Sequence, residues 1–264
     1  MLEIKNVFKT FNAGTINEKV ALNGLNLELK KGDFVTVIGG NGAGKSTMLN
    51  AVAGVFPVDE GKILIDGVDV THLPEYKRAK FIGRVFQDPM MGTAATMQIE
   101  ENLAMAARRG KPRTLRIGIT RQEREEYREK LKILELGLED RMTAKVGLLS
   151  GGQRQALTLL MATLQEPKLL LLDEHTAALD PKTAAKVLEA TQRIVEKSNL
   201  TTMMITHNMR DAIAYGNRLI MMYDGHVVVD VSGEEKKHLT VEQLLNLFSQ
   251  ASGSDEVNDK LLLA

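Results

Sequence analysis

A glycine-rich turn joins a short apolar run to a helical stretch, and this unit constrains the fold more than any other feature. The apolar run, Phe34–Ile38, is typical of a strand buried on both faces of a sheet. The turn at residues 39–46 has the spacing G-x-x-x-x-G-K-S, and residues 45–54 continue as a helix. Because glycine backbone and a helix N-terminus both direct N–H groups toward an anion, the sequence predicts a phosphate-binding loop.

The loop indicates a nucleoside triphosphate. Lys45 is expected to contact the β- and γ-phosphates, and the hydroxyl of Ser46 is a suitable ligand for Mg²⁺. The alternative, a glycine-rich turn with an exposed lysine, does not account for the position of the pattern between a buried strand and a helix start. The predicted nucleotide contacts of this segment are Gly39, Gly40, Asn41, Gly42, Ala43, Gly44, Lys45, Ser46 and Thr47.

Composition narrows the class of protein. The 264 residues include 34 basic and 34 acidic side chains, so no global charge favours nucleic acid or an anionic membrane. The chain has no cysteine, which excludes disulfides and cysteine-ligated metals. No apolar stretch approaches the roughly 20 residues that span a bilayer, and the N-terminus lacks the layout of a secretory signal. We therefore expect a cytoplasmic protein whose membrane partner, if any, is another chain.

Predicted strands alternate with helices in both halves of the chain. Apolar runs at residues 2–7, 21–29, 168–172 and 201–206 predict strands, and residues 181–197 predict a helix between the last two. This alternation predicts an α/β protein with a parallel, doubly wound sheet.

The middle of the chain is helical and rich in charge. Tyr127, Leu131, Leu134 and Leu138 fall at helical spacing, and the surrounding residues predict a helical insertion. Residues 239–250 predict an amphipathic helix, which a polar tail follows. The predicted organisation is one domain with a core at residues 1–88 and 166–232, the insertion at residues 89–165, and a C-terminal helix and tail at residues 233–264.

Two acids follow the run of leucines at residues 169–172. Ligands bind at the carboxyl ends of the strands in open α/β sheets, where the phosphate loop also lies. Asp173 is therefore expected to hold Mg²⁺, directly or through water, and Glu174 to act at the γ-phosphate as a general base or a water-orienting group. Taken alone, such a pair is as often a helix cap.

A second predicted anion site begins at Ser150. Residues 149–155 read LSGGQRQ, so a capping serine precedes two glycines whose N–H groups are exposed at a helix start. One nucleotide does not need two such sites in one chain. A dimer does need them, if each chain gives its phosphate loop to one ATP and its Ser150 helix to the other.

These motifs, in this order, resemble those of the nucleotide-binding subunits of ABC transporters over about residues 1–232. The resemblance implies a P-loop NTPase fold, with a RecA-like core and an antiparallel β-subdomain, plus an inserted α-helical subdomain. It implies that Gln87 senses Mg²⁺ and water and contacts a membrane subunit, that Asp180 communicates across the dimer, and that His207 touches the γ-phosphate.

The resemblance also groups the expected site residues. Catalytic roles are implied for Glu174, His207, Gln87 and Lys45, and ligation of Mg²⁺ for Ser46, Gln87 and Asp173. Phe11 stands where the family stacks an aromatic ring on adenine, although Phe8 competes for that role. The contacts implied for the second half of an ATP site are Ser150, Gly151, Gly152, Gln153 and Asp180.

Three features lie outside these motifs. His175 replaces the proline common after the catalytic glutamate, and either perturbs Glu174 electrostatically or fills a surface or packing position. Met90 and Met91 follow Gln87, where the family meets its membrane partner, and suggest an adaptable apolar contact. Residues 108–121 include six basic side chains and no acid, which indicates either a solvated loop or contact with anionic lipid or an acidic permease loop.

The exact residues at positions 39–47, 173–180 and 206–211 are similar to those of ATPases of bacterial amino-acid importers, including tryptophan/tyrosine-type systems. This similarity implies two ATPase copies, an integral membrane permease and an extracytoplasmic solute-binding protein, at the cytoplasmic face of the membrane and without nucleic acid. The alternatives are the ATPase of an exporter, a soluble non-transport ABC ATPase and a non-catalytic ATP-binding scaffold. One phosphate loop and a short insertion disfavour the second alternative, and Glu174 with His207 disfavours the third.

Overall fold

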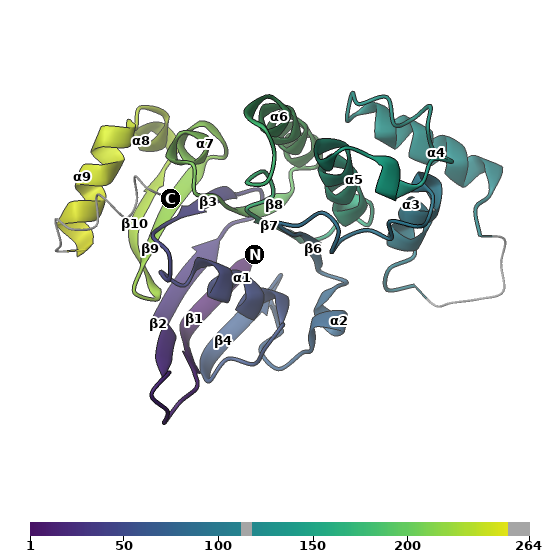
Figure 1. Cartoon of the computed structure of the whole chain (residues 1–264). Helices are drawn as coiled ribbons and strands as arrows, with labels where there is room; N and C mark the ends of the chain where they lie inside the picture. Colours follow the sequence, from purple (N-terminus) through teal and green to yellow (C-terminus); the bar gives the residue numbers. More distant parts are fainter. Residues whose placement is uncertain (112–117, 253–264) are drawn as a thin grey trace. The chain divides into compact units, whose positions relative to one another are not determined.

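Two units share the chain, and the predicted phosphate loop and the Ser150 helix start fall in different ones. The structure, a computed structural model, describes residues 1–111 and 118–252. One unit, here the loop unit, consists of Met1–Phe81 and the chain from Thr201 onward. The other, here the signature unit, is Ile82–Leu200. Figure 1 labels most of the elements of both units.

The loop unit contains an antiparallel sheet with the strand order β2-β1-β4-β5. Strand β1 pairs with β2 on one side and with β4 on the other, and its apolar side chains Leu2, Ile4 and Val7 are buried. This is the antiparallel β-subdomain that the resemblance implied. The strand bounds are Leu2–Phe11 for β1, Lys19–Leu29 for β2, Glu60–Ile65 for β4 and Val68–Asp69 for β5.

Four further strands of the loop unit follow the order β10-β9-β3-β8. Strand β3 pairs in parallel with β8 and with β9, and all five of its residues are buried, as expected for a central strand. Strand β10 pairs antiparallel with β9. The bounds are Phe34–Ile38 for β3, Thr201–Ile205 for β8, Arg218–Tyr223 for β9 and His226–Ser232 for β10.

The C-terminal helix of the loop unit is amphipathic, as predicted, and lies two residues later than expected. Its buried side chains Leu244 and Phe248 join a core cluster with residues of β9 and β10, and the ring of Phe248 meets that of Tyr223 edge to face at 5.7 Å. The helices of this unit are α1 (Lys45–Ala53), α2 (Glu75–Arg78), α7 (Met209–Ala214), α8 (Gly233–Lys237) and α9 (Val241–Ser252).

The far end of α1 is held by a buried arginine. Arg78 is 2% exposed, and its Nη1 donates to the carbonyl oxygens of Ala51 and Val52 at 2.7 and 2.8 Å. These carbonyls lie in the last turn of α1, where a helix has unsatisfied acceptors and partial negative charge. Arg78 therefore fixes the helix whose other end follows the phosphate loop.

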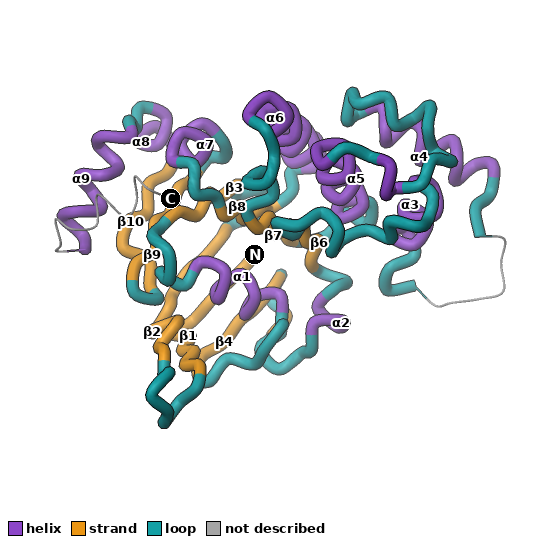
Figure 2. The backbone as a smooth tube through the Cα atoms, viewed as in Figure 1, coloured by secondary structure: helices purple, strands orange, loops and turns teal. Residues whose placement is uncertain are grey.

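The signature unit combines a parallel strand pair with the predicted helices. Strand β6 (Ile82–Val85) pairs in parallel with β7 (Leu169–Asp173), and the four leucines of β7 are buried. Figure 2 shows how much of this unit is helical. Its helices are α3 (Ile99–Ala107), α4 (Arg121–Lys132), α5 (Gly151–Thr163), α6 (Pro181–Ser198) and a short 3-10 turn at Val146–Leu148.

Helix α4 is shorter than the helical spacing of apolar residues in the sequence predicts. Tyr127 and Leu131 are buried on α4, whereas Leu134 and Leu138 are buried beyond its end. Glu135 adopts a left-handed backbone with φ of 53°, so the chain turns and brings the later leucines to the core without a helix. The predicted insertion, residues 89–165, lies within the signature unit, and the boundaries proposed from the sequence remain a prediction.

Candidate nucleotide site

The loop after β3 is curled around its own lysine. Lys45 is 5% exposed, and its Nζ donates to the carbonyl oxygens of Gly39 at 2.7 Å and Gly40 at 3.2 Å. The N–H of Gly225, in the turn between β9 and β10, donates to the carbonyl oxygen of Ala43 at 3.2 Å. These hydrogen bonds hold the ammonium and the loop backbone in place.

Two of the loop glycines are required by close backbone contacts. A Cβ at Gly39 would lie 2.3 Å from the carbonyl oxygen of Met222, and one at Gly44 would lie 2.6 Å from that of Ala21. Gly44 precedes α1, and within the part of the chain that the structure describes no side chain caps that helix start. A helix start without a side-chain cap suits a bound phosphate, because the N-terminus of a helix favours an anion.

His207 lies on the same sheet edge as the loop. In the parallel pairing of β3 with β8, Val37 lies opposite Ile205, and the N–H of Thr206 donates to the carbonyl oxygen of Val37 at 3.2 Å. Gly39 lies two residues after Val37, and His207 lies two residues after Ile205. The side chain of His207 is half-buried. The structure therefore brings His207 and the phosphate loop to one edge of the loop unit.

The aromatic candidates for adenine occupy different surroundings. The ring of Phe11, at the end of β1, meets that of Phe56 edge to face at 5.2 Å, with Nζ of Lys9 5.5 Å from its centroid. Phe8 packs over Gly24 of β2, since a Cβ there would lie 3.2 Å from its ring. Phe8 is thus part of the sheet packing, and stacking of Phe11 on adenine stays a prediction.

Asp173 and Gln87 lie at one edge of the signature unit. Val85 and Leu172 are partners in the parallel pairing of β6 with β7. Asp173 is the next residue after Leu172, and Gln87 follows Val85 by two residues with its side chain exposed. The carboxylate and the amide predicted to hold Mg²⁺ therefore stand at neighbouring strand ends.

Glu174 has a backbone conformation that could not be predicted from the sequence. Its φ is 46°, in the left-handed region that residues with a side chain seldom occupy. The N–H of Ala177 donates to its carbonyl oxygen at 3.0 Å, so the chain turns directly after β7. A left-handed residue at a strand end is a form of local strain that clusters at functional sites.

The Ser150 helix start is capped as predicted. Ser150 Oγ accepts from the N–H of Gln153 at 3.2 Å, and Gln153 Oε1 accepts from the N–H of Ser150 at 3.1 Å. Because the serine oxygen is the acceptor in this cap, its own O–H stays available as a donor. Ser150 and Gly151 are exposed, so the tip of this helix faces solvent. Gly152, which was also expected to be exposed, is buried because it packs against Thr183.

The same helix start contacts the loop that contains Asp180. A Cβ at Gly152 would lie 2.0 Å from Cγ2 of Thr183, and one at Gly151 would lie 3.3 Å from a methyl group of Leu179. Asp180 Oδ1 accepts from the N–H of Thr183 at 3.1 Å and caps α6. Hydrogen bonds from the hydroxyl and the N–H of Thr183 lower the pKa of the Asp180 carboxyl.

The family profile described as ABC transporter matches residues 22–177. The chain belongs to the ABC transporter family. It is an ATP-binding subunit and an ATPase.

Individual ABC proteins resemble the chain over nearly its whole length. It is 45% identical to the tyrosine transport ATP-binding protein of Clostridioides difficile (strain R20291), covering 95% of this chain and 100% of that protein. It is 30% identical to the bacitracin export ATP-binding protein BceA of Halalkalibacterium halodurans, covering 93% of this chain and 94% of the relative.

A solved structure also shares this ABC ATPase fold. It is a dimeric ATP-binding cassette in a post-hydrolysis state bound to ADP and Pi, with a TM-score of 0.75 and 32% identity. The alignment covers 88% of this chain and 98% of the solved one. Among the described residues, no helix is both long and apolar enough to cross a membrane.

Two further side chains lie beside predicted site residues and were missed by the sequence interpretation. Gln155, from the LSGGQRQ stretch, donates through Nε2 to the carbonyl oxygen of Phe86 at 3.1 Å, just before Gln87. Nζ of Lys19 would lie 3.4 Å from a Cβ at Gly42 and so approaches the phosphate loop. Only the repeated glutamine of the signature stretch hinted at Gln155, and no local pattern indicated Lys19.

His175 is buried and neutral. Its side chain is 2% exposed, and burial lowers its pKa to about 4. The Thr191 hydroxyl donates to the carbonyl oxygen of Val187 at 2.8 Å and therefore accepts from His175 Nε2 at 3.1 Å. The packing position anticipated for His175 is thus a core position, and at neutral pH it adds no charge beside Glu174.

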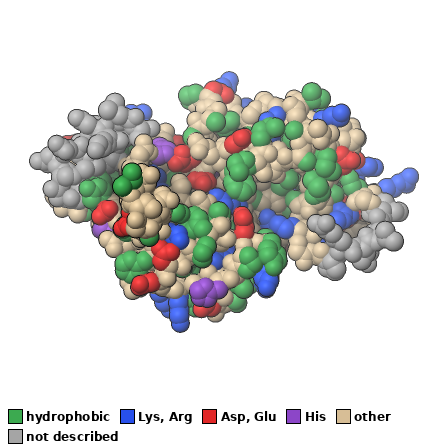
Figure 3. Space-filling view, turned by 60° about the horizontal axis from the view of Figure 1, so that its bottom comes forward, with side chains coloured by type: hydrophobic (Ala, Val, Ile, Leu, Met, Phe, Trp, Pro, Cys, Tyr) green, Lys and Arg blue, Asp and Glu red, His purple; other side chains and the backbone are tan. Residues whose placement is uncertain are grey.

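The basic run is partly engaged within the chain. Arg108 donates to Ala104 and to the carboxylate of Glu123, at 3.0 and 2.8 Å. Residues 112–117 of the run lie outside the described residues. On the face seen in Figure 3, basic and acidic side chains are scattered among apolar ones, in keeping with their equal numbers.

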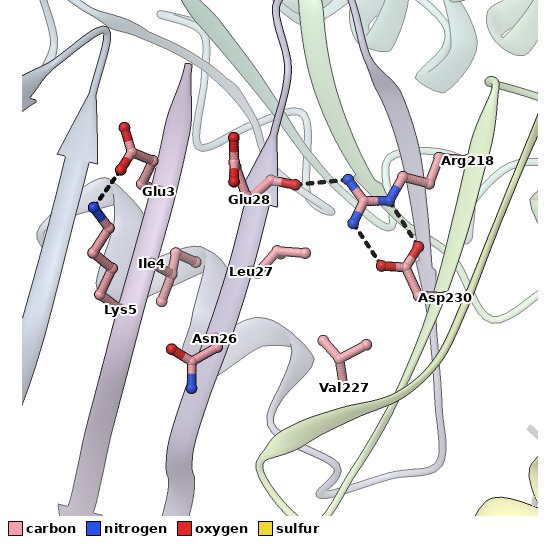
Figure 4. A pocket seen from close by; sticks show the side chains of 9 residues that line it. All are labelled: Glu3, Ile4, Lys5, Asn26, Leu27, Glu28, Arg218, Val227 and Asp230. Atoms are coloured by element: carbon pink, nitrogen blue, oxygen red, sulfur yellow. Dashed lines mark hydrogen bonds and ion pairs between the residues drawn. The ribbon is translucent and has the colours of Figure 1, made fainter.

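A separate cavity of about 330 Å³ lies in the loop unit, between β1–β2 and β9–β10. The guanidinium of Arg218 donates to both oxygens of Asp230 and to the carbonyl oxygen of Glu28, at 2.6 to 2.7 Å (Figure 4). None of the nucleotide contacts predicted from the sequence lines this cavity.

Gly152→Ala should destabilise the protein by about 1–3 kcal/mol, because its methyl group would overlap Thr183 Cγ2. Thr183→Ser removes that methyl group and keeps the hydroxyl, so the double variant should recover most of the loss. Urea unfolding of the two single variants and the double variant measures this coupling. If the losses in free energy of unfolding of the two single variants simply added in the double variant, the two side chains would not compete for the same space.

The buried His175 should make stability fall in mild acid. Its pKa is about 4 in the folded protein and near 6.5 when exposed, so protons favour the unfolded chain as the pH falls from about 6.5 to about 4. As the pH falls from about 7.5 to about 5.5, His175 should lower the free energy of unfolding by about 1 kcal/mol. His175→Asn should reduce this loss in thermal unfolding, whereas His72→Asn, at an exposed position, is the matched control. Equal pH dependence of wild type and His175→Asn would contradict the assignment.

Proposed function

We propose that this protein powers uptake of an amino acid, as one of two ATPase copies bound to a membrane permease at the cytoplasmic face of the membrane. The observation that carries the proposal is the 45% identity with a tyrosine transport ATP-binding protein over that relative's whole length. An extracytoplasmic solute-binding protein is the expected third component. The transported molecule does not touch the ATPase, so the ATPase site itself does not select it.

Within one copy, we propose that the loop unit binds the triphosphate and that both units supply groups for the metal and for hydrolysis. The loop backbone, Lys45 and the start of α1 neutralise the β- and γ-phosphates. Ser46, Gln87 and Asp173 offer hydroxyl, amide and carboxylate oxygens, the hard donor set that suits Mg²⁺. Mg²⁺, when bound, neutralises charge on the phosphate oxygens. Phe11 stacks on the adenine ring.

Each copy completes the nucleotide site of its partner. The capped helix start is exposed at Ser150 and Gly151, whereas Gly152 is buried against Thr183. A helix start of this kind favours an anion such as a γ-phosphate. Asp180 is exposed beside it and is linked to it through Thr183. The dimeric relative bound to ADP and Pi supports this arrangement. Gly151, Gly152 and Gln153 belong to the same half of the site.

Hydrolysis depends on two groups at strand ends. Glu174 takes the proton of the attacking water or orients that water, and His207 contacts the γ-phosphate. The left-handed backbone of Glu174 supports this role, because it directs the residue after β7 away from the strand path. Binding of ATP favours the closed pair, and loss of the γ-phosphate reopens it.

A patch of exposed apolar side chains suits the permease. Met90, Met91 and Leu148 are 44%, 70% and 71% exposed. Arg154 donates to Sδ of Met90 and to the carbonyl oxygen of Gly147, so the two exposed segments lie together. Adaptable methionines beside Gln87 offer a docking surface that the nucleotide site can influence.

Export is the second candidate direction, since the bacitracin export relative is 30% identical. Co-purification of the permease and the solute-binding protein, followed by reconstitution in vesicles, decides between the two. We expect ATP to drive labelled tyrosine or tryptophan from the membrane side opposite the ATPase to the side where the ATPase is bound. ATP-driven movement in the opposite direction alone would reject uptake.

Glu174→Gln should slow ATP hydrolysis by at least about 10²-fold and leave ATP binding intact, because the amide cannot accept the proton of water. Glu166→Gln is the matched control, since Glu166 also has a left-handed backbone, with φ of 48°. Steady-state phosphate release and the retention of bound ATP measure the two effects. Hydrolysis at a near-normal rate would remove Glu174 from this role.

Replacing Met90 and Met91 together by Ser should weaken binding to the permease by at least about 10-fold, because apolar contact area is lost. ATP binding should not change. Val68→Ser, at a position that is 43% exposed in the loop unit, is the control for loss of an exposed apolar side chain. Unchanged assembly in a pull-down titration with the permease would reject this docking surface.

A further inference from the structure

Strand β2 runs beside the phosphate loop and brings a lysine to it. A Cβ at Gly44 would lie 2.6 Å from the carbonyl oxygen of Ala21, so the loop backbone packs directly on the strand. Two residues earlier on both segments, Nζ of Lys19 would lie 3.4 Å from a Cβ at Gly42. These two contacts between one strand and one loop place the ammonium of Lys19 beside the middle of the phosphate loop.

Lys19 also lies opposite the aromatic ring predicted to stack on adenine. In the antiparallel pairing of β1 with β2, Phe11 and Lys19 are direct partners. Directly opposed residues of an antiparallel pair carry their side chains on the same face of the sheet. The side chain of Lys19 therefore starts next to Phe11 and reaches the phosphate loop at Gly42. A nucleotide that stacks on Phe11 and enters the loop passes this ammonium.

A second lysine near Phe11 is already engaged within the fold. Nζ of Lys9 lies 5.5 Å from the centroid of the Phe11 ring and donates to Oδ1 of Asp59 at 2.7 Å. The side chain of Lys9 is only 12% exposed. Lys19 is exposed, and within the described part of the chain no carboxylate pairs with it. Lys9 is thus neutralised by Asp59, whereas the ammonium of Lys19 is open to an anionic ligand.

We propose that Lys19 is a further binding residue for the phosphate chain of ATP. The buried Lys45 donates to carbonyl oxygens of its own loop, whereas Lys19 adds an ammonium from the neighbouring strand. Its flexible four-carbon stem lets this ammonium follow the phosphate oxygens. The spacing of the phosphate-loop pattern does not require a lysine at this position. The inference rests on the proposed binding of ATP by the loop, with its adenine on Phe11.

Lys19→Gln tests the proposal, because the charge is lost from an exposed side chain that the fold does not need. Full-length wild type and variant are titrated with a fluorescent ATP analogue at constant MgCl₂. At low salt the variant should bind the analogue about 5-fold more weakly, the size of effect expected of an exposed pair of opposite charges. Near about 0.5 M salt the difference should fall below about 2-fold, because salt screens exposed charges. Lys19→Arg retains the charge and should bind as wild type.

Tripolyphosphate separates contact with the phosphates from contact with the base, since it has no adenine. Its inhibition constant in competition with the analogue should rise by a similar factor in Lys19→Gln at low salt. An inhibition constant equal to that of wild type would reject the contact with the phosphate chain.

The controls separate this inference from the proposed function. Lys30→Gln removes an exposed lysine directly after the other end of β2 and should bind the analogue as wild type. Equal analogue affinity of wild type and Lys19→Gln at low salt, or a loss that salt does not reduce, would overturn the proposal. Lys45→Ala tests the loop itself: if it leaves analogue binding unchanged, the proposed role of the phosphate loop fails as well.

Discussion

The bond between Lys45 and the carbonyls of Gly39 and Gly40 shapes the nucleotide site. A buried ammonium needs oxygen partners, and here the loop that begins at the end of β3 supplies them. The loop therefore curls around the ammonium, and α1 starts directly after it without a side-chain cap in the described chain. Since β8 runs parallel to β3, the same edge also carries His207. One buried charge thus organises the loop unit.

The signature unit contributes a different set of groups. Asp173, Glu174 and Gln87 stand at the ends of β6 and β7, while the Ser150 helix start is exposed and is packed against Thr183 of α6. A capped, glycine-rich helix start that is exposed at Ser150 and Gly151 is suited to an anion that another molecule holds. This is the physical basis for the proposal that each copy supplies one half of each of two nucleotide sites.

Much of this could be predicted from local sequence, because local pattern determines it. The apolar run at residues 34–38 is β3 to the residue, and the expected helix at residues 181–197 is α6 with one residue added. Three features depend on the tertiary structure. Burial of His175 against α6, the ion pair of Arg84 with Asp173 and the left-handed backbone of Glu174 arise from contacts or turns that neither composition nor periodicity encodes. Likewise, the helical spacing beyond Lys132 could not reveal the turn at Glu135.

The central claim is that one copy holds only part of each nucleotide site, and mixing two inactive variants tests it most directly. Lys45→Ala damages the phosphate-loop half, and Ser150→Arg damages the helix-start half. Neither variant alone should hydrolyse ATP, but a mixed pair contains one site with both halves intact. We predict that mixing the two purified variants restores measurable ATP hydrolysis. A mixture as inactive as its components, or full activity of Ser150→Arg alone, would contradict the account.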